Sequence, residues 1–138
     1  MKASKAKELP EKVVKYHPVK SLTYATIGIF TAFTREPNLI LQLLIGVFFF
    51  IIAWTFNIKI YGLLNIFLMA LVISVEMVNS AMETLCDLLH PAYSPKIKIV
   101  KDIMAGSVLV VSLTWLALLL LLILNIPQIK DYINYSLF

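Results

Sequence analysis

Three long apolar runs divide the sequence. From Pro37 to Ile58 no residue is ionisable, and a run of this size is about long enough to cross a hydrocarbon layer at 1.5 Å per residue. The second run starts near Ile60 and keeps a helical period until His90-Pro91 stops it. The third carries no charge from Ile103 to Gln128, with Pro127 at its end. This pattern predicts three transmembrane helices, at about residues 37–57, 60–89 and 98–126.

A shorter segment precedes the first apolar run. The stretch from Val19 to Thr34 follows Pro18, has apolar residues near helical spacing and is flanked by Lys20 and Arg35. These features predict an amphipathic helix over residues 19–35 that lies on the membrane surface. We therefore expect a basic N-terminal segment at 1–18, followed by one membrane domain at 19–138.

Composition agrees with this interpretation. Hydrophobic residues make up 60% of the 138 residues, and the mean hydropathy is +0.87, whereas an average soluble domain is about 45–50% apolar. The fold class expected is an all-α integral membrane protein. A single cysteine, Cys86, excludes an intramolecular disulfide and cannot by itself form a thiolate metal site.

The positive charges predict the topology. Only Lys59 and Lys130 fall between the first two spans or after the third. All the others precede the first span or lie between the second and third, and they are Lys2, Lys5, Lys7, Lys12, Lys15, Lys20, Arg35, Lys96, Lys98 and Lys101. By the positive-inside rule the N-terminus and the second loop are cytoplasmic. The net charge of +4 is thus a topology signal, and we expect no nucleic-acid partner.

Acidic residues gather at the same end of the spans, where burial is costly enough to need a reason. Five of the eight acidic residues lie at or just inside the cytoplasmic ends: Glu36, Glu76, Glu83, Asp87 and Asp102. On the second span, offsets of zero, three, four, seven and eleven place Glu76, Asn79, Ser80, Glu83 and Asp87 on one helix face. Such a face is unstable by repulsion unless a cation lies among the carboxylates.

The chemistry of this face suggests a magnesium–nucleotide site. Oxygen ligands select a hard divalent ion, and Mg²⁺ is commonly held by one or two carboxylates together with substrate phosphates. Lys101, beside Asp102, supplies a point charge for phosphate oxygens. Glu76 stands deeper than the other carboxylates, so it is the natural general base for a lipid hydroxyl that approaches from the bilayer.

Other interpretations of these residues stay open. Asp87 and Asp102 could be solvated charges at helix ends, and the lysines could serve only topology. A small proton-coupled transporter would also use buried carboxylates, although no inverted or dual repeat is visible. A non-catalytic assembly partner would tolerate neutral substitutions in the cluster. No Gly-rich phosphate loop is present, so a nucleotide would be held by side chains and a metal.

The second span resembles the signature of the small bacterial lipid kinases, the family that includes prokaryotic diacylglycerol kinase and the undecaprenol kinases. That signature reads Glu-x-x-Asn-(Ser/Thr)-Ala-(Ile/Met)-Glu-x-x-x-Asp, and the sequence here has Glu76, Asn79, Ser80, Ala81, Met82, Glu83 and Asp87. Lys101-Asp102 and the small residues after it resemble the next block of the family. Upstream, Tyr24, Gly28 and Glu36 keep the family's spacing of four and eight residues.

The resemblance implies a membrane lipid kinase that transfers the γ-phosphate of ATP to a lipid hydroxyl. It implies Glu76 as the catalytic base, Glu36 and Glu83 as ligands of Mg²⁺, and a homotrimer in the bacterial cell membrane with its sites between subunits. The remaining residues that it places at the nucleotide and its surroundings are Tyr24, Asn79, Asp87, Lys101 and Asp102.

Three positions depart from the family pattern. Ile40 stands where the family commonly has Arg, Gln42 where the Gram-positive branch often has His, and His17 at an N-terminal position that is often Arg. The departures concern contacts with the lipid head more than the chemistry. The segment around Lys96 to Lys98 and the block Ala105 to Val108 are similar to the Gram-positive branch, so undecaprenol is the favoured acceptor and diacylglycerol the alternative.

Overall fold

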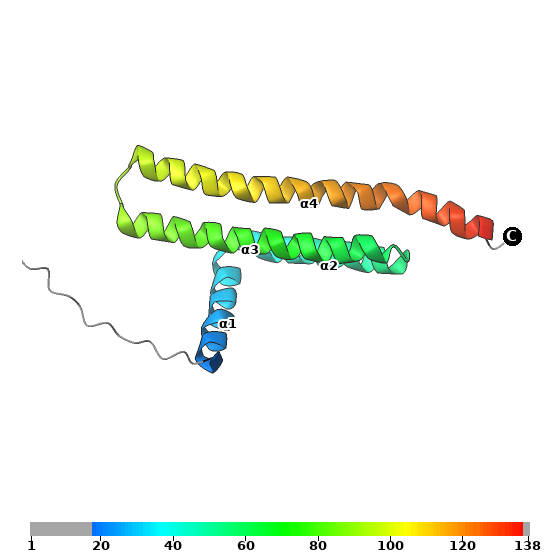
Figure 1. Cartoon of the computed structure of the whole chain (residues 1–138), viewed down its shortest axis with the longest axis horizontal. Coiled ribbons are helices and arrows are strands. Elements are labelled where there is room, and N and C mark those ends of the chain that lie inside the picture. The colour runs from blue at the N-terminus through cyan, green and yellow to red at the C-terminus, as the bar shows by residue number, and fades with distance from the viewer. Residues whose placement is uncertain (1–17, 137–138) are drawn as a thin grey trace, which may run out of the picture.

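The computed structural model describes residues 18–136, with side chains described up to Ile126. Its elements are α1 (Pro18–Arg35), α2 (Pro37–Thr55), α3 (Lys59–Leu89) and α4 (Pro95–Ser136). The last three lie alongside one another, while α1 projects away from the start of α2, on the side opposite α4 (Figure 1). Residues 1–17 of the predicted basic segment (1–18), with His17 among them, lie outside the described residues.

Three of these helices are long and apolar enough to span a membrane: Pro37–Thr55, Lys59–Leu89 and Pro95–Ile126. The chain is therefore an all-α integral membrane protein with a separate N-terminal helix, which confirms the predicted fold class. The third spanning helix begins three residues earlier than predicted, because Pro95 suits the first turn of a helix. The helix does not end near Pro127 as predicted but continues to Ser136, since an internal proline removes only one backbone donor.

A tight turn joins α2 to α3 and makes them antiparallel. Asn57 adopts φ 57°, a left-handed conformation that asparagine tolerates better than most residues. The backbone N–H of Ile58 donates to the Ala53 carbonyl at 2.9 Å and closes the turn. Because the connection is short, the start of α2 and the end of α3 meet at the same end of the bundle.

Small residues let α2 and α3 approach closely. A Cβ added to Gly46 would lie 2.1 Å from the sulfur of Met69 and 3.2 Å from its Cβ. Met69 also belongs to a buried cluster with Val72, Trp115 and Leu119, which joins α3 to α4. Glycine at an interhelical contact is typical of membrane helices, where backbone proximity replaces the hydrophobic effect as the source of packing energy.

One polar side chain lies in this apolar core. Asn65 is fully buried; its Nδ2 donates to the Gly46 carbonyl at 2.8 Å, and its Oδ1 accepts from Trp115 Nε1 at 2.9 Å. A buried amide is stable only when its hydrogen bonds are made. The contacts of Asn65 join α2, α3 and α4 and so hold the three spans in register.

Candidate functional site

Glu36 lies at the break between α1 and α2. It has an extended backbone, with φ −115° and ψ 93°, and Pro37 occupies the first turn of the helix that follows. Its Oε1 accepts a hydrogen bond of 2.7 Å from the hydroxyl of Ser80 on α3. The break in the helix thus turns the Glu36 carboxylate toward the polar face of α3.

Glu76 lies one helical turn deeper along α3. Its carboxylate is within electrostatic range of Glu36 and Glu83 and lies beside the side chain of Asn38. One of its oxygens, Oε2, is buried and has no hydrogen-bond partner among the described residues, and the same is true of Oε1 of Gln42 on α2. A buried acceptor without a donor is costly, so Glu76 Oε2 is suited to receive a proton or hydrogen bond from a ligand.

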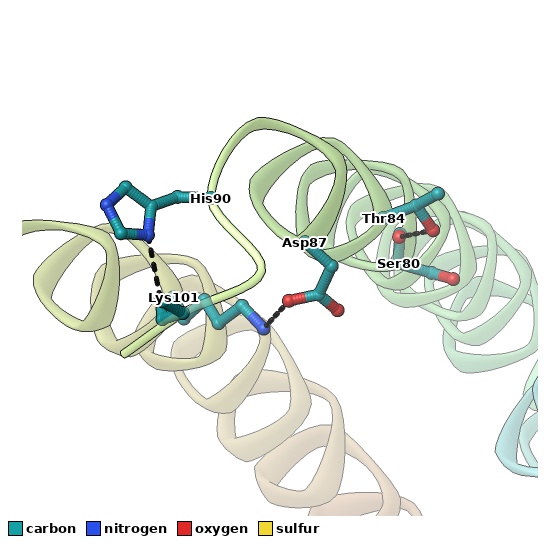
Figure 2. Close-up of polar contacts among 6 residues, drawn as sticks. Ser80, Thr84, Asp87, His90 and Lys101 are labelled. Atoms are coloured by element: carbon teal, nitrogen blue, oxygen red, sulfur yellow. Dashed lines mark hydrogen bonds and ion pairs between the residues drawn. The ribbon is translucent and has the colours of Figure 1, made fainter. Parts of the chain in front are cut away.

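A second group of charges joins α3 to α4. Lys101 Nζ on α4 contacts Asp87 Oδ1 on α3 at 2.6 Å, whereas the contact of 2.7 Å between Lys98 Nζ and Asp102 Oδ2 lies within α4. In Figure 2 the Asp87 side chain points from α3 toward α4, and Lys101 extends to meet it. The side chains of Asp87, Lys98 and Asp102 are more than half exposed, so these groups are accessible to a ligand from water.

An open pocket of about 510 Å³ lies at the turn between α3 and α4. Charged residues from both helices line it: Glu83, Asp87, Lys98, Lys101 and Asp102. His90 and Tyr93 from the turn complete its wall, and His90 Nδ1 lies 2.8 Å from the Ala92 carbonyl (Figure 2). The pocket thus combines cations, carboxylates and ring side chains at the end of the bundle where Glu36 also lies.

The structure brings together most of the residues singled out from the sequence. Glu36, Glu76 and Glu83 form one group, while Asp87, Lys101 and Asp102 line the pocket next to it, with Glu83 common to both. Asn79 is half-buried on the same helix. Tyr24 is the exception, since it lies on α1 with 70% of its surface exposed and lines neither the pocket nor the carboxylate group.

Within the described part of the chain, no three acidic, histidine or cysteine side chains are placed to hold a metal ion by themselves. Mg²⁺ does not require such a set, because it is commonly bound through one or two carboxylates and completes its shell with water and phosphate oxygens. Glu36 and Glu83, with hard oxygen donors in the same group, fit that mode of binding.

The sequence of this chain was compared with known protein families. Residues 23–124 match the family described as prokaryotic diacylglycerol kinase. The chain belongs to the prokaryotic diacylglycerol kinase family. Membership agrees with the resemblance found in the sequence and indicates a membrane lipid kinase. Comparisons with curated proteins and with solved structures gave no significant match.

Within this kinase-family domain, the sequence did not identify every residue that the site uses. Ser80 was placed on the polar face of α3 without a partner, and the structure shows that it holds Glu36. His90 and Tyr93 line the pocket at the turn, although neither was assigned to the site. Both residues follow Asp87 in or beside a short loop between two polar helix ends, where side chains from both helices converge. This position is the feature of the sequence that could have identified them.

Proposed function

We propose that this chain is an ATP-dependent lipid kinase that transfers the γ-phosphate of ATP to the hydroxyl of a membrane lipid alcohol. The observation that carries the proposal is the buried, unpartnered Oε2 of Glu76 beside Glu36 and Glu83. A carboxylate inside a spanning helix is costly and is a functional site by default. The family match supports the same conclusion.

ATP would bind at the pocket between α3 and α4. Lys101 and Lys98 offer ammonium groups to phosphate oxygens, and at about 510 Å³ the pocket is within the usual size range of small-molecule sites. Glu36 and Glu83 would hold Mg²⁺, which neutralises charge on the phosphates when it is bound. Asn79, Asp87 and Asp102 would complete the polar wall around the nucleotide, and Tyr24 would flank it.

Glu76 acts as the general base in the proposed reaction. As the oxygen of the lipid hydroxyl attacks the γ-phosphorus, its proton passes to the Glu76 carboxylate. The bond between the γ-phosphorus and the bridging oxygen breaks, and ADP leaves with both electrons of that bond. The products are a lipid phosphate monoester and ADP. The protein forms no covalent bond to the transferred group in this reaction, so positioning of the reactants and stabilisation of charge provide most of the catalysis.

The proposed acceptor is undecaprenol, with diacylglycerol as the alternative. We further propose a bacterial cell-membrane location in which the end with Glu36 and Lys101 faces the cytoplasm. Arg35, Lys96, Lys98 and Lys101 lie at that end of the spans, whereas Lys59 lies at the other, and positive charge favours the cytoplasmic side. A homotrimer would cover part of the large apolar surface that single helices leave exposed.

The test is phosphate transfer in detergent-purified protein. Mg–ATP is supplied with undecaprenol or with a short-chain diacylglycerol, and the lipid phosphate is measured in each case. Transfer to undecaprenol supports the proposed acceptor, and transfer only to diacylglycerol selects the alternative. Chelation of the metal should stop transfer to either lipid without unfolding the protein.

Glu76→Gln is the matched variant, since it keeps the size of the side chain and removes its basicity. It should abolish turnover while assembly and nucleotide binding persist. Absence of transfer from wild-type protein to either lipid would refute the kinase proposal. Loss of folded protein in Glu76→Gln would instead assign this carboxylate a structural role.

A further inference from the structure

A separate pocket of about 340 Å³ lies between α1 and α3. Its wall on α1 consists of Gly28, Thr31, Ala32 and Arg35, and its wall on α3 consists of Met77, Ser80, Ala81 and Thr84. It shares no lining residue with the pocket at the turn between α3 and α4. Ser80 belongs both to this wall and to the hydrogen bond with Glu36, so the pocket adjoins the carboxylate group from the side of α1.

Each of the three hydroxyl groups that line this pocket already donates a hydrogen bond within the protein. Thr31 donates to the Ile27 carbonyl at 2.8 Å, and Ser80 donates to Glu36 at 2.7 Å. Thr84 donates to the Ser80 carbonyl at 3.0 Å, a contact visible in Figure 2. A hydroxyl has one proton to give, so these three side chains present only lone pairs to a ligand.

Among the described residues, Arg35 is the one charged donor that lines this pocket. Its guanidinium carries five N–H groups in a planar fork that matches two oxygens of a phosphate. The other lining side chains are small or apolar, and a Cβ added at Gly28 would meet nothing within 4 Å. The pocket thus has open space, an apolar wall and a single anion-binding group next to Glu36 in the chain.

We propose that this pocket receives the head of the acceptor lipid and that Arg35 holds the phosphate monoester formed on it. The inference rests on the proposed lipid kinase function and adds a positioning residue for its product. The acceptor enters neutral and leaves with a charged phosphate, which Arg35 pairs with through two parallel hydrogen bonds. Diacylglycerol and undecaprenol yield the same phosphate group, so Arg35 serves either acceptor.

The experiment measures binding of lipid phosphates without ATP. Detergent-purified full-length protein is titrated with dioctanoyl phosphatidate and, separately, with a short-chain polyprenyl phosphate. Arg35→Gln should weaken both affinities about tenfold, the effect expected for loss of a charge-assisted bidentate contact. Arg35→Lys should recover part of the loss, because a lysine keeps the charge but not the fork. The KM for ATP should stay unchanged in both variants.

Lys59→Gln is the matched control, since Lys59 lies at the opposite end of the bundle, 5.4 Å from the ring centre of Trp54. Equal phosphate affinities in wild type, Arg35→Gln and Arg35→Lys would overturn the inference. A loss confined to phosphatidate would overturn it too, in favour of recognition of the glycerol esters. If Arg35→Gln does not fold, Arg35→Lys decides, and unchanged phosphate affinity in that variant refutes the assignment.

These outcomes are separable from those of the kinase test. Wild-type protein that transfers no phosphate to a lipid, yet binds lipid phosphates through Arg35, would refute the kinase proposal and leave the lipid-phosphate site standing. Wild-type protein that phosphorylates a lipid, with phosphate binding indifferent to Arg35, would refute the site alone.

Discussion

Trp115 on α4 donates its indole N–H to the side-chain oxygen of Asn65 on α3, across 2.9 Å in the middle of the bundle. The other end of the same amide donates to the carbonyl of Gly46 on α2. One asparagine therefore connects all three spans. Since Asn65 lies three helical turns below Glu76 on the same helix, this contact also fixes how α3 presents its carboxylates.

Replacing Asn65 by leucine should destabilise the bundle. The substitution keeps the approximate size of the side chain but leaves the Trp115 N–H without an acceptor. An interhelical hydrogen bond in a membrane contributes about 0.6–2 kcal/mol, so Asn65→Leu, which removes two, should lower the free energy of unfolding by about 1–4 kcal/mol. Reversible unfolding in mixed detergent micelles measures this change.

Trp115→Phe removes the donor alone and completes a double-mutant cycle with Asn65→Leu. Because the two side chains share one hydrogen bond, their effects should be less than additive. Additive effects of the two substitutions would mean that the bond between them contributes nothing.

Gly46→Ala should also weaken the contact between α2 and α3. The added Cβ would collide with the Met69 side chain, which is buried and has little room to move. Overpacking of this kind costs about 1–3 kcal/mol, and Met69→Ala in the same protein should restore part of the loss. Thermal unfolding with a bound dye follows both variants.

Gly106→Ala provides the comparison for the Gly46 variant. A Cβ at Gly106 meets nothing within 4 Å in this chain, and alanine is the better helix former by about 1 kcal/mol. It should therefore leave stability unchanged or raise it. Destabilisation by Gly106→Ala would show that another copy of the chain approaches α4 there.

Ser80→Ala should impair the reaction through Glu36 rather than through folding. The hydroxyl donates the 2.7 Å hydrogen bond that orients the Glu36 carboxylate. Without it we expect about tenfold lower turnover, since a hydrogen bond to a charged group contributes about 1.5–3 kcal/mol. The concentration of Mg²⁺ that gives half-maximal activity should rise as well.

Ser74→Ala is the matched control for Ser80→Ala. Ser74 lies on the same helix, is exposed, and donates only to the Ala70 carbonyl. The two alanine variants should have the same thermal stability and differ in activity. An unchanged Mg²⁺ dependence in Ser80→Ala would contradict a metal-binding role for Glu36.

The architecture was largely predictable because apolar runs and charge positions determine it. The uncharged stretch from Pro37 to Ile58 can only cross a membrane or be buried, and the proline at each of α1, α2 and α4 favours a helix start there. The gathering of Glu36, Glu76 and Glu83 at one end also followed from the spans themselves, because antiparallel helices return to the same side.

The pairing of the polar side chains was not predictable. Helical periodicity placed Ser80 and Asp87 on one face, yet Ser80 contacts Glu36 at the break between α1 and α2, and Asp87 contacts α4. That choice depends on how three helices pack, which no single helix encodes. The partners of Asn65 were predictable in kind, because an amide in the middle of a spanning run is rarely tolerated without hydrogen bonds to neighbouring helices.

The ion pair of Lys101 with Asp87 yields the last prediction. The pair is partly exposed, with 32% and 68% of the two side chains accessible, and exposed ion pairs contribute about 0–1 kcal/mol to stability. Lys101→Gln should therefore leave thermal unfolding almost unchanged. Its effect should appear in phosphoryl transfer, where loss of a cation beside the phosphates should lower kcat/KM for ATP about a hundredfold.

Asp87→Asn separates the two roles of Lys101. It frees the ammonium group from its carboxylate partner but keeps the charge, so it should reduce kcat/KM for ATP far less than Lys101→Gln does. Lys59→Gln, at the opposite end of the bundle, should reduce neither the thermal stability nor kcat/KM for ATP. If Lys101→Gln unfolded the protein as readily as Asn65→Leu, the contact with Asp87 would be a structural clamp between α3 and α4. Full activity in a folded Lys101→Gln variant would remove this lysine from the nucleotide site, and the phosphates would then have to bind elsewhere along the pocket.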